Sequence, residues 1–359
     1  FLLPNQRLLT FVDNGTSVLN GLLLFLFVLI INDKPKIKKL VLPSFIILSY
    51  GVFLVFVNDS LFELAMILKL LITCIVCFVL FTQSSSDYLY AAIFYFILGS
   101  LAVGILSFLY GSLEIGGYTR FEGGIGNEPN YAGTLFSLSL SLFLYIEKRL
   151  YINLLLKWLI PAVLIFFGIL TMSRAFILSA TVIVTVYLLY KLRDSLVQML
   201  LFAFVASWVF LERIIIFYNN SALLQILTER IINPRNDDVS GGRLGFWTDY
   251  WFLITSTYWN LFFGLGSSAM SKADLEQVAH NFFLEDMLTF GLIGVLLLYS
   301  FLLYFFNYFK REQVRIYILL PLTIFLLNGL TLHSFLGMGG LAMYFICLLP
   351  FYINKKEII

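Results

Sequence analysis

Long apolar runs alternate with short polar segments along most of this sequence. A helix that crosses a bilayer needs about 20 predominantly apolar residues, because the hydrocarbon core is about 30 Å thick. The polar interruptions divide the sequence into eleven predicted spans: 16–31, 40–57, 61–81, 88–110, 131–146, 155–172, 174–190, 195–211, 281–306, 316–332 and 338–353. We therefore expect an all-α polytopic membrane protein, with 1–359 forming a single integral membrane domain.

Two further segments extend this prediction. The first four residues, Phe-Leu-Leu-Pro, resemble the tail of another apolar run, so a twelfth helix is expected to precede them. The longest polar excursion, 212–280, is expected to form one large loop outside the membrane. Within it, 221–232 is typical of a short amphipathic helix, and an aromatic-rich helix follows Arg243. Aromatic residues at a membrane edge usually form an interfacial belt, although they can also stack on sugars.

The composition agrees with a membrane location. Hydrophobic residues make up 60% of the chain and charged residues 12%, and the mean hydropathy is +0.94. The three cysteines, Cys74, Cys77 and Cys347, lie among apolar neighbours. They predict neither a disulfide framework nor a metal site.

The distribution of charge predicts the orientation. Fourteen of the 23 cations, with only six acids, fall in segments that the alternating spans assign to one side, whereas nine cations share the other side with fifteen acids. Because cytoplasmic loops retain Lys and Arg, the first side is expected to be cytoplasmic. The net charge of +2 is thus the sum of about +8 inside and −6 outside, and it gives no indication of nucleic-acid binding.

The outer side is rich in arginine. Ten of the fourteen inner cations are Lys, whereas seven of the other nine are Arg: Arg7, Arg120, Arg174, Arg213, Arg230, Arg235 and Arg243. A planar guanidinium can hold an oxyanion through two hydrogen bonds, so this bias favours phosphate binding at the outer face. The alternative is that these arginines pair with the outer acids or with lipid headgroups.

Two outer segments carry candidate ligands for a phosphate or a sugar. The glycine-rich stretch 111–130 contains Arg120 and ends at Asn130, which stands at a helix start where its position favours a capping role over a ligand role. Arg174 lies in a tight turn between two spans. A charge at such a depth is costly and usually functional, although the side chain can also reach the headgroups.

The large loop contributes a third set of arginines. Arg243 follows two glycines, whose backbone N–H groups can face an anion beside the guanidinium. Arg230 and Arg235 precede it in the loop. The acidic pair at 237–238 is equally well explained by solvation, so no metal site is predicted.

Both histidines of the chain, His280 and His333, are predicted on the outer side. His280 is followed by Asn281, Glu285 and Asp286 at the start of the ninth span. An imidazole with a pKa near its ordinary value of about 6.5 can accept a proton from a hydroxyl at neutral pH. Asn281 and Glu285 are candidate substrate ligands, and the two acids can also complement the helix dipole.

These motifs resemble the O-antigen polymerase and ligase superfamily of bacterial surface polysaccharide assembly. The family's His-Asn, followed after nine residues by Gly-x-x-Gly, is matched by His280, Asn281, Gly291 and Gly294. Four further family elements have counterparts in this sequence: Arg174 with Leu178, Gly242-Arg243 before Trp247, Gly264-Leu265-Gly266, and the Asn-Glu-Pro-Asn segment 127–130.

The resemblance implies a metal-independent, inverting glycosyltransferase with a GT-C-type fold and no cofactor. It implies a place in the bacterial cytoplasmic membrane, with the active site facing the periplasm or the cell exterior. The donor would be a glycan on undecaprenyl diphosphate. Arg174 and Arg243 would hold the diphosphate, with Arg120, Arg230 and Arg235 assisting, and His280 would act as the base or orient the acceptor hydroxyl.

Three functions remain possible, and the acceptor distinguishes the first two. A polymerase transfers the glycan to another lipid-linked repeat unit, whereas an O-antigen ligase transfers it to lipid A-core. The abundance of Phe, Ile, Leu, Tyr, Asn and Lys favours the polymerase, whose partners would include chain-length regulator and flippase proteins. A flippase of lipid-linked sugars is the alternative from another class. It would need a polar path across the membrane, but the mid-membrane charges are few, with Lys69 the deepest.

Overall fold

The computed structural model of the protein describes ten segments of the chain: 34–58, 62–110, 112–115, 118–121, 129–150, 152–191, 243–266, 279–309, 315–330 and 338–356. The predicted spans 16–31 and 195–211 and the helix expected over 221–232 lie outside these residues. The same is true of most of the large loop.

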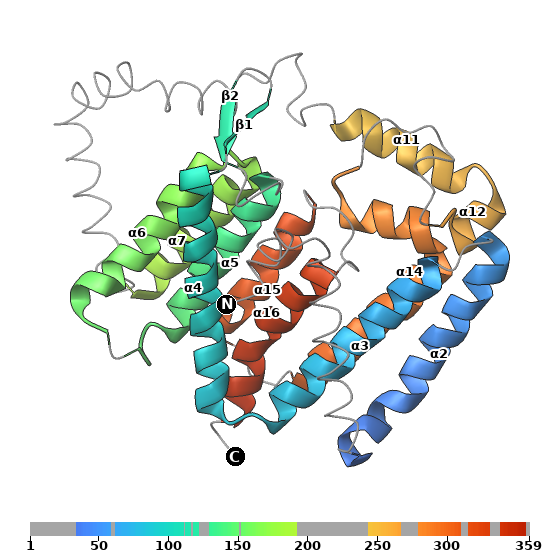
Figure 1. The fold of residues 1–359 in the computed structure, drawn as a ribbon, viewed down its shortest axis with the longest axis horizontal. Helices are drawn as coiled ribbons and strands as arrows, with labels where there is room; N and C mark the ends of the chain where they lie inside the picture. The colour runs from blue at the N-terminus through green and yellow to red at the C-terminus, as the bar shows by residue number, and fades with distance from the viewer. Residues whose placement is uncertain are drawn as a thin grey trace.

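The described chain is almost entirely helical (Figure 1). Its helices are α2 (Lys34–Asn58), α3 (Phe62–Gln83), α4 (Ser86–Tyr110), α5 (Pro129–Ile146), α6 (Leu154–Leu170), α7 (Arg174–Lys191), α11 (Arg243–Thr255), α12 (Tyr258–Phe263), α14 (Phe282–Phe309), α15 (Ile316–Gly329) and α16 (Met338–Lys356). The nine predicted spans that fall within the described residues all coincide with helices. A short antiparallel hairpin, β1 (Ser112–Ile115) with β2 (Tyr118–Phe121), lies in the segment expected to be a glycine-rich loop.

Four of these helices contain a stretch that is long and apolar enough to cross a membrane: Lys38–Asn58, Leu64–Gln83, Ser86–Leu109 and Phe282–Phe309. Three shorter helices are also apolar: Leu154–Leu170, Arg174–Leu189 and Ile316–Gly329. The chain is therefore a helical membrane protein, as the hydropathy pattern predicts.

Helix α5 lies at the centre of one part of the bundle, packed against α4, α6, α7 and α15. Its small residues permit close approach of the neighbouring helices. A Cβ added at Gly133 would lie 3.0 Å from the Cβ of Ser173, and the Ser139 hydroxyl donates to Ser100 of α4 at 2.7 Å. Most of the α5 residues are consequently buried.

A buried asparagine joins three of these helices. Asn328 of α15 is fully buried, and its Nδ2 lies 2.9 Å from the hydroxyl oxygen of Ser179 in α7 and 3.3 Å from that of Ser137 in α5. A polar group inside a membrane protein must find a partner within the bundle, because the hydrocarbon offers none. These contacts therefore fix the register of α15 against α5 and α7.

The segments assigned to the cytoplasm by their charge meet at one end of the bundle, the lower end in Figure 1. Lys355 of α16 donates to the Tyr308 carbonyl at 2.7 Å, and its ammonium lies 5.1 Å from the centre of that ring. Lys39 of α2 lies over the same ring at 5.5 Å. Lys356 of α16 donates to the carbonyl of Ser84, just beyond α3. Helix ends that are far apart in sequence thus share this end of the bundle.

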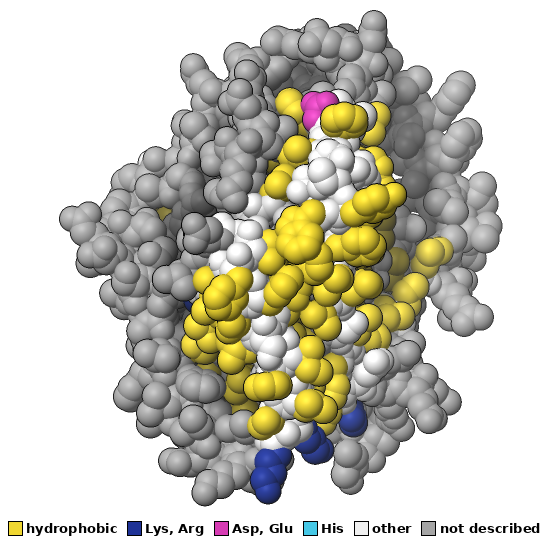
Figure 2. Space-filling view, turned by 90° about the vertical axis from the view of Figure 1, so that its right-hand side faces the viewer, with side chains coloured by type: hydrophobic (Ala, Val, Ile, Leu, Met, Phe, Trp, Pro, Cys, Tyr) yellow, Lys and Arg dark blue, Asp and Glu magenta, His cyan; other side chains and the backbone are white. Residues whose placement is uncertain are grey.

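The outer surface has the charge distribution of a bilayer-spanning protein. Figure 2 shows the face at the right of Figure 1, with Lys and Arg side chains at its lower end, an acidic side chain at its upper end and hydrophobic side chains between them. On α2 the exposed apolar side chains include Leu42, Phe45 and Phe56. Such a surface is stable in contact with lipid rather than water.

The predicted orientation can be tested with single cysteines in a background that lacks the three native ones. Tyr258 at the start of α12 is 86% exposed, and Asp87 at the start of α4 is exposed at the opposite end of the bundle. In intact cells, Tyr258→Cys should react with an impermeant thiol reagent, whereas Asp87→Cys should react only after the membrane is opened. Labelling of Asp87→Cys from outside would reverse the orientation.

Candidate functional site

Helix α14 is broken at Gly291, although the sequence predicts one continuous span over 281–306. Gly291 has φ 66° and ψ 177°, which no α-helix contains. The break divides α14 into a first part that ends at Phe290 and a second part that begins at Leu292. Figure 1 shows the first part of α14 running across the second.

A side-chain contact across the break shows that the two parts of α14 fold toward each other. The Tyr299 hydroxyl donates to Oδ2 of Asp286 at 2.9 Å, and Asp286 is fully buried. In a straight helix these residues would be separated by about 20 Å along the axis, at 1.5 Å per residue. The hydrogen bond is therefore possible only because the two parts of α14 fold toward each other.

The break leaves helical carbonyl groups without their usual N–H donors, and other segments replace them. The Leu265 N–H donates to the Leu288 carbonyl at 2.7 Å, and the Gly266 N–H donates to the Thr289 carbonyl at 3.2 Å. The Tyr50 hydroxyl of α2 donates to the Phe290 carbonyl. All three carbonyls just before the break thus accept hydrogen bonds, as buried backbone groups must.

Two glycine motifs of the sequence meet at this break. Gly264 has φ 76°, and a Cβ added there would lie 2.6 Å from the backbone nitrogen of Gly291. A Cβ added at Gly291 would lie 2.4 Å from the Phe262 carbonyl oxygen. Only glycine permits both the positive φ angles and this close approach of two backbones. The Gly-x-Gly at 264–266 and the Gly-x-x-Gly at 291–294 therefore form one contact.

His280 and Asn281 are held at the start of α14 by hydrogen bonds. The Asn281 side chain caps the helix, accepting from the N–H groups of Phe283 at 3.1 Å and Leu284 at 3.3 Å. Oε1 of Glu285 accepts from the backbone N–H of His280 at 3.0 Å, and His280 adopts a φ of 49°. Glu285 thus has a specific positioning contact, beyond the dipole effect that its place in the helix predicts.

Helix α11 covers the first part of α14. Nε1 of Trp247 donates to the Ala279 carbonyl at 2.8 Å, next to His280. Tyr250 is 1% exposed; its burial raises its pKa to about 12, and the Glu285 carboxylate adds to this shift. The aromatic residues of this segment therefore do not all form an exposed belt. Trp247 and Tyr250 pack inward, whereas Tyr258 remains exposed.

The turn before Arg174 contacts the start of α5. Ser173 caps α7, since its hydroxyl accepts from the Phe176 N–H at 3.4 Å, and the same hydroxyl donates to Oδ1 of Asn130 at 3.2 Å. Both polar side chains are buried, and Arg174 beside them is partly buried. Asn130 therefore joins the start of α5 to the turn before α7. The sequence predicted a helix cap at this residue and not this contact.

A contact of the Phe282 ring with Gly329 places His280 and Arg174, with their neighbours, at the same end of the bundle. The ring of Phe282 lies where a Cβ of Gly329 would be, with ring atoms 1.3 and 2.2 Å from that position. Gly329 follows Asn328, which binds Ser179 of α7. The end of α15 thus lies between the start of α14 and the α5–α7 pair that carries Arg174.

Several predicted site residues have no described side chain. Arg243 is the first residue of α11 and Arg120 lies in β2 opposite Leu113, but these assignments concern the backbone alone. Arg230, Arg235 and His333 lie outside the described residues. Within the described part of the chain, no three His, Cys, Asp or Glu residues are grouped as metal ligands.

The sequence reasoning missed the pairing of Asp286 with Tyr299. An acid inside an apolar run indicates a buried contact, because a carboxylate rarely enters a membrane alone. Tyr299 could not be recognised as the partner, because residues thirteen positions apart lie far from each other along a straight helix.

No family model, curated protein or solved structure matches this chain. The family resemblance therefore rests on the motifs, and the activity that it implies remains a proposal.

The contact between the two glycine motifs predicts a large effect of a single methyl group. Gly291→Ala should be destabilising, because a left-handed φ costs an alanine about 1–2 kcal/mol and the new Cβ would overlap the Phe262 carbonyl. We expect the melting temperature in detergent to fall by about 4 °C or more.

Gly245→Ala on α11 is the matched control. A Cβ there has nothing within 4 Å, and alanine favours a helix over glycine by roughly 0.5–1 kcal/mol. Its melting temperature should equal or exceed that of the wild type. Equal melting temperatures for the two variants would contradict the described packing at the break.

Proposed function

We propose that the protein is a polysaccharide polymerase of the O-antigen or capsule type. It would transfer a glycan from undecaprenyl diphosphate to a sugar hydroxyl of a second lipid-linked repeat unit. The reaction would take place at the outer face of the bacterial cytoplasmic membrane, in a GT-C-like helical fold.

The observation that carries this proposal is the meeting of motifs at the break in α14. His280-Asn281 begins the first part of that helix, the 264–266 glycines dock at Gly291, and the helix that starts with Arg243 packs over both. Segments separated in sequence thus come together in one region, as expected if their similarity to the family reflects a shared site.

The second group of motifs supports the same proposal. Arg174 follows Ser173, which binds Asn130 of the Asn-Glu-Pro-Asn segment. The Phe282 ring on Gly329 joins this group to the histidine end through α15. The described parts of all five motif elements are therefore connected by these contacts, with the Arg243 element joined through Trp247 of α11.

The chemistry of the transfer assigns a role to each group. The acceptor hydroxyl attacks the anomeric carbon, its proton passes to His280, and the bond to undecaprenyl diphosphate breaks with inversion. Negative charge develops on the departing diphosphate, and the guanidinium groups of Arg174 and Arg243 would stabilise it. Glu285 is a positioning residue, because it binds the backbone of His280 and can fix where the imidazole lies.

The reaction itself separates the candidate functions. Purified protein supplied only with undecaprenyl-diphosphate-linked repeats should produce a ladder of longer lipid-linked glycans and release undecaprenyl diphosphate, with or without a chelator. His280→Ala should reduce the ladder more than it reduces binding of the lipid donor. A glycan product formed only after lipid A-core is added would indicate the ligase, and movement of lipid-linked sugar without a new glycosidic bond would indicate the flippase.

If Arg174 and Arg243 bind the diphosphate, a positive charge alone should not sustain the transfer reaction. Arg174→Lys and Arg243→Lys should each lower the rate by about tenfold or more, because an ammonium cannot reproduce the paired hydrogen bonds of a guanidinium. The control is Lys38→Arg, an exchange between the same residue types at an exposed position at the opposite end of the bundle. Near-normal ladders from both Lys variants would leave these arginines with a role in topology or headgroup contact only.

A further inference from the structure

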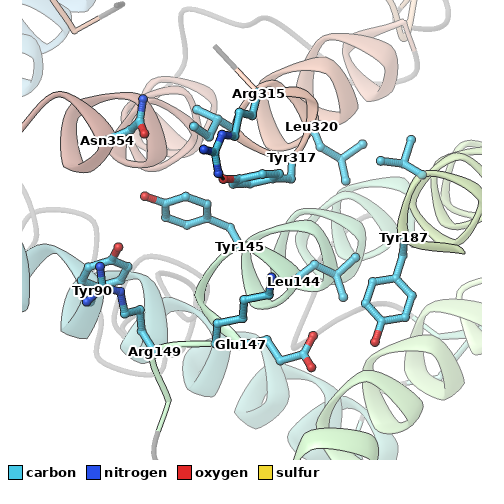
Figure 3. A pocket seen from close by; sticks show the side chains of 13 residues that line it. Tyr90, Leu144, Tyr145, Glu147, Arg149, Tyr187, Arg315, Tyr317, Leu320 and Asn354 are labelled. Atoms are coloured by element: carbon cyan, nitrogen blue, oxygen red, sulfur yellow. Dashed lines mark hydrogen bonds between the residues drawn. The ribbon is translucent and has the colours of Figure 1, made fainter. Parts of the chain in front are cut away.

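A cavity of about 800 Å³ lies at the end of the bundle opposite to Arg174 and His280 (Figure 3). It is open to one side and is lined by the ends of five helices: α4, α5, α7, α15 and α16. Its volume is that of a site for a small organic molecule and far exceeds the space that an inorganic ion fills. None of the proposed catalytic residues lines it.

The charge of the lining is positive. Lys148, Arg149 and Arg315 line the cavity together with one acid, Glu147, which gives a formal charge of +2. The three cations are exposed at its rim. Cations arranged in this way attract an anion and are screened by salt.

Tyrosines hold the two guanidinium groups in place. The Arg149 guanidinium lies 5.7 Å from the centre of the Tyr90 ring, and Nη1 of Arg315 donates to the Tyr317 hydroxyl at 3.0 Å. Tyr145 stacks on both rings, with centroid distances of 6.1 Å to Tyr90 and 6.3 Å to Tyr317. Figure 3 shows the two arginines on opposite walls, with Tyr145 between them. Each guanidinium thus has one tyrosine contact that favours its position at the cavity.

The remaining lining is mainly apolar, apart from the Asn354 amide and the Tyr187 hydroxyl. The apolar part is supplied by four aliphatic side chains from three helices: Leu144, Val186, Ile318 and Leu320. A site with cations at the rim and an aliphatic wall suits an amphiphile, whose charged head binds the rim and whose hydrocarbon contacts the wall.

We propose that this cavity binds the phosphate headgroup of an anionic membrane lipid, with Arg149 and Arg315 as its ligands. The site lies at the lysine-rich end of the bundle, where Lys355 and Lys356 mark the level of the membrane boundary. Basic cavities between helices at this level recognise anionic headgroups, and a guanidinium can bind a phosphate through two hydrogen bonds. The proposal is independent of the transferase activity at the other end.

Lipid binding to the intact protein in detergent tests this site, measured by native mass spectrometry with dioleoyl phosphatidylglycerol and dioleoyl phosphatidylcholine. Phosphatidylglycerol should bind more tightly, and the preference should weaken as the salt concentration rises. In Arg149→Gln/Arg315→Gln the affinity for phosphatidylglycerol should fall by about tenfold or more. Each single substitution should have a smaller effect in the same direction, which keeps the test valid if the double variant folds poorly.

The matched control is Lys38→Gln/Lys39→Gln, which removes the same charge from exposed positions of α2 outside the cavity. Its affinity should stay within about twofold of the wild type, since neither lysine lines the cavity. Equal losses in the two double variants, or equal binding of phosphatidylcholine, would overturn the site. Displacement of the lipid by millimolar inorganic phosphate would also overturn it, because the ligand would then be a free anion.

Discussion

The backbone hydrogen bonds at Gly291 are the constraint on which much of this structure depends. A helix within a membrane protein cannot be broken unless other groups satisfy its exposed carbonyls, because lipid provides no donors. Here the donors come from the 264–266 segment and from Tyr50 of α2. The break therefore fixes three separate parts of the chain relative to one another, and it holds the first part of α14 beside α11.

Buried polar side chains add a second level of specification. Van der Waals packing between apolar helices tolerates small shifts in register, whereas a hydrogen bond in a low-dielectric interior does not. Asn328 relates α15 to α5 and α7, and Asp286 relates the two parts of α14 through Tyr299. Each of these groups would be costly to bury alone, so the arrangement that gives the Asn328 Nδ2 and the Asp286 carboxylate their partners is preferred.

The sequence predicted the helices well because the signal for each is local. About 20 apolar residues identify a span whatever lies around it in the fold. The charges at its two ends predict its orientation in the membrane. The break at Gly291 could not be predicted in this way, because glycine also occurs inside regular membrane helices and the deciding contact is with Gly264. Likewise, the motifs gave His280 and Asn281 as candidates, but the roles of Glu285 and Trp247 in holding them depend on contacts that only the folded chain reveals.

The contacts of α16 bear on how the protein is assembled during synthesis. This helix follows all the other described helices in sequence, yet its Tyr352 hydroxyl donates to the Thr82 carbonyl of α3 at 3.4 Å, and Lys355 binds the end of α14. Helices α3 and α14 are therefore synthesised before the helix that completes their contacts, α16. Their polar ends remain incompletely paired until α16 is made, and an incompletely assembled chain of this kind is prone to misassembly.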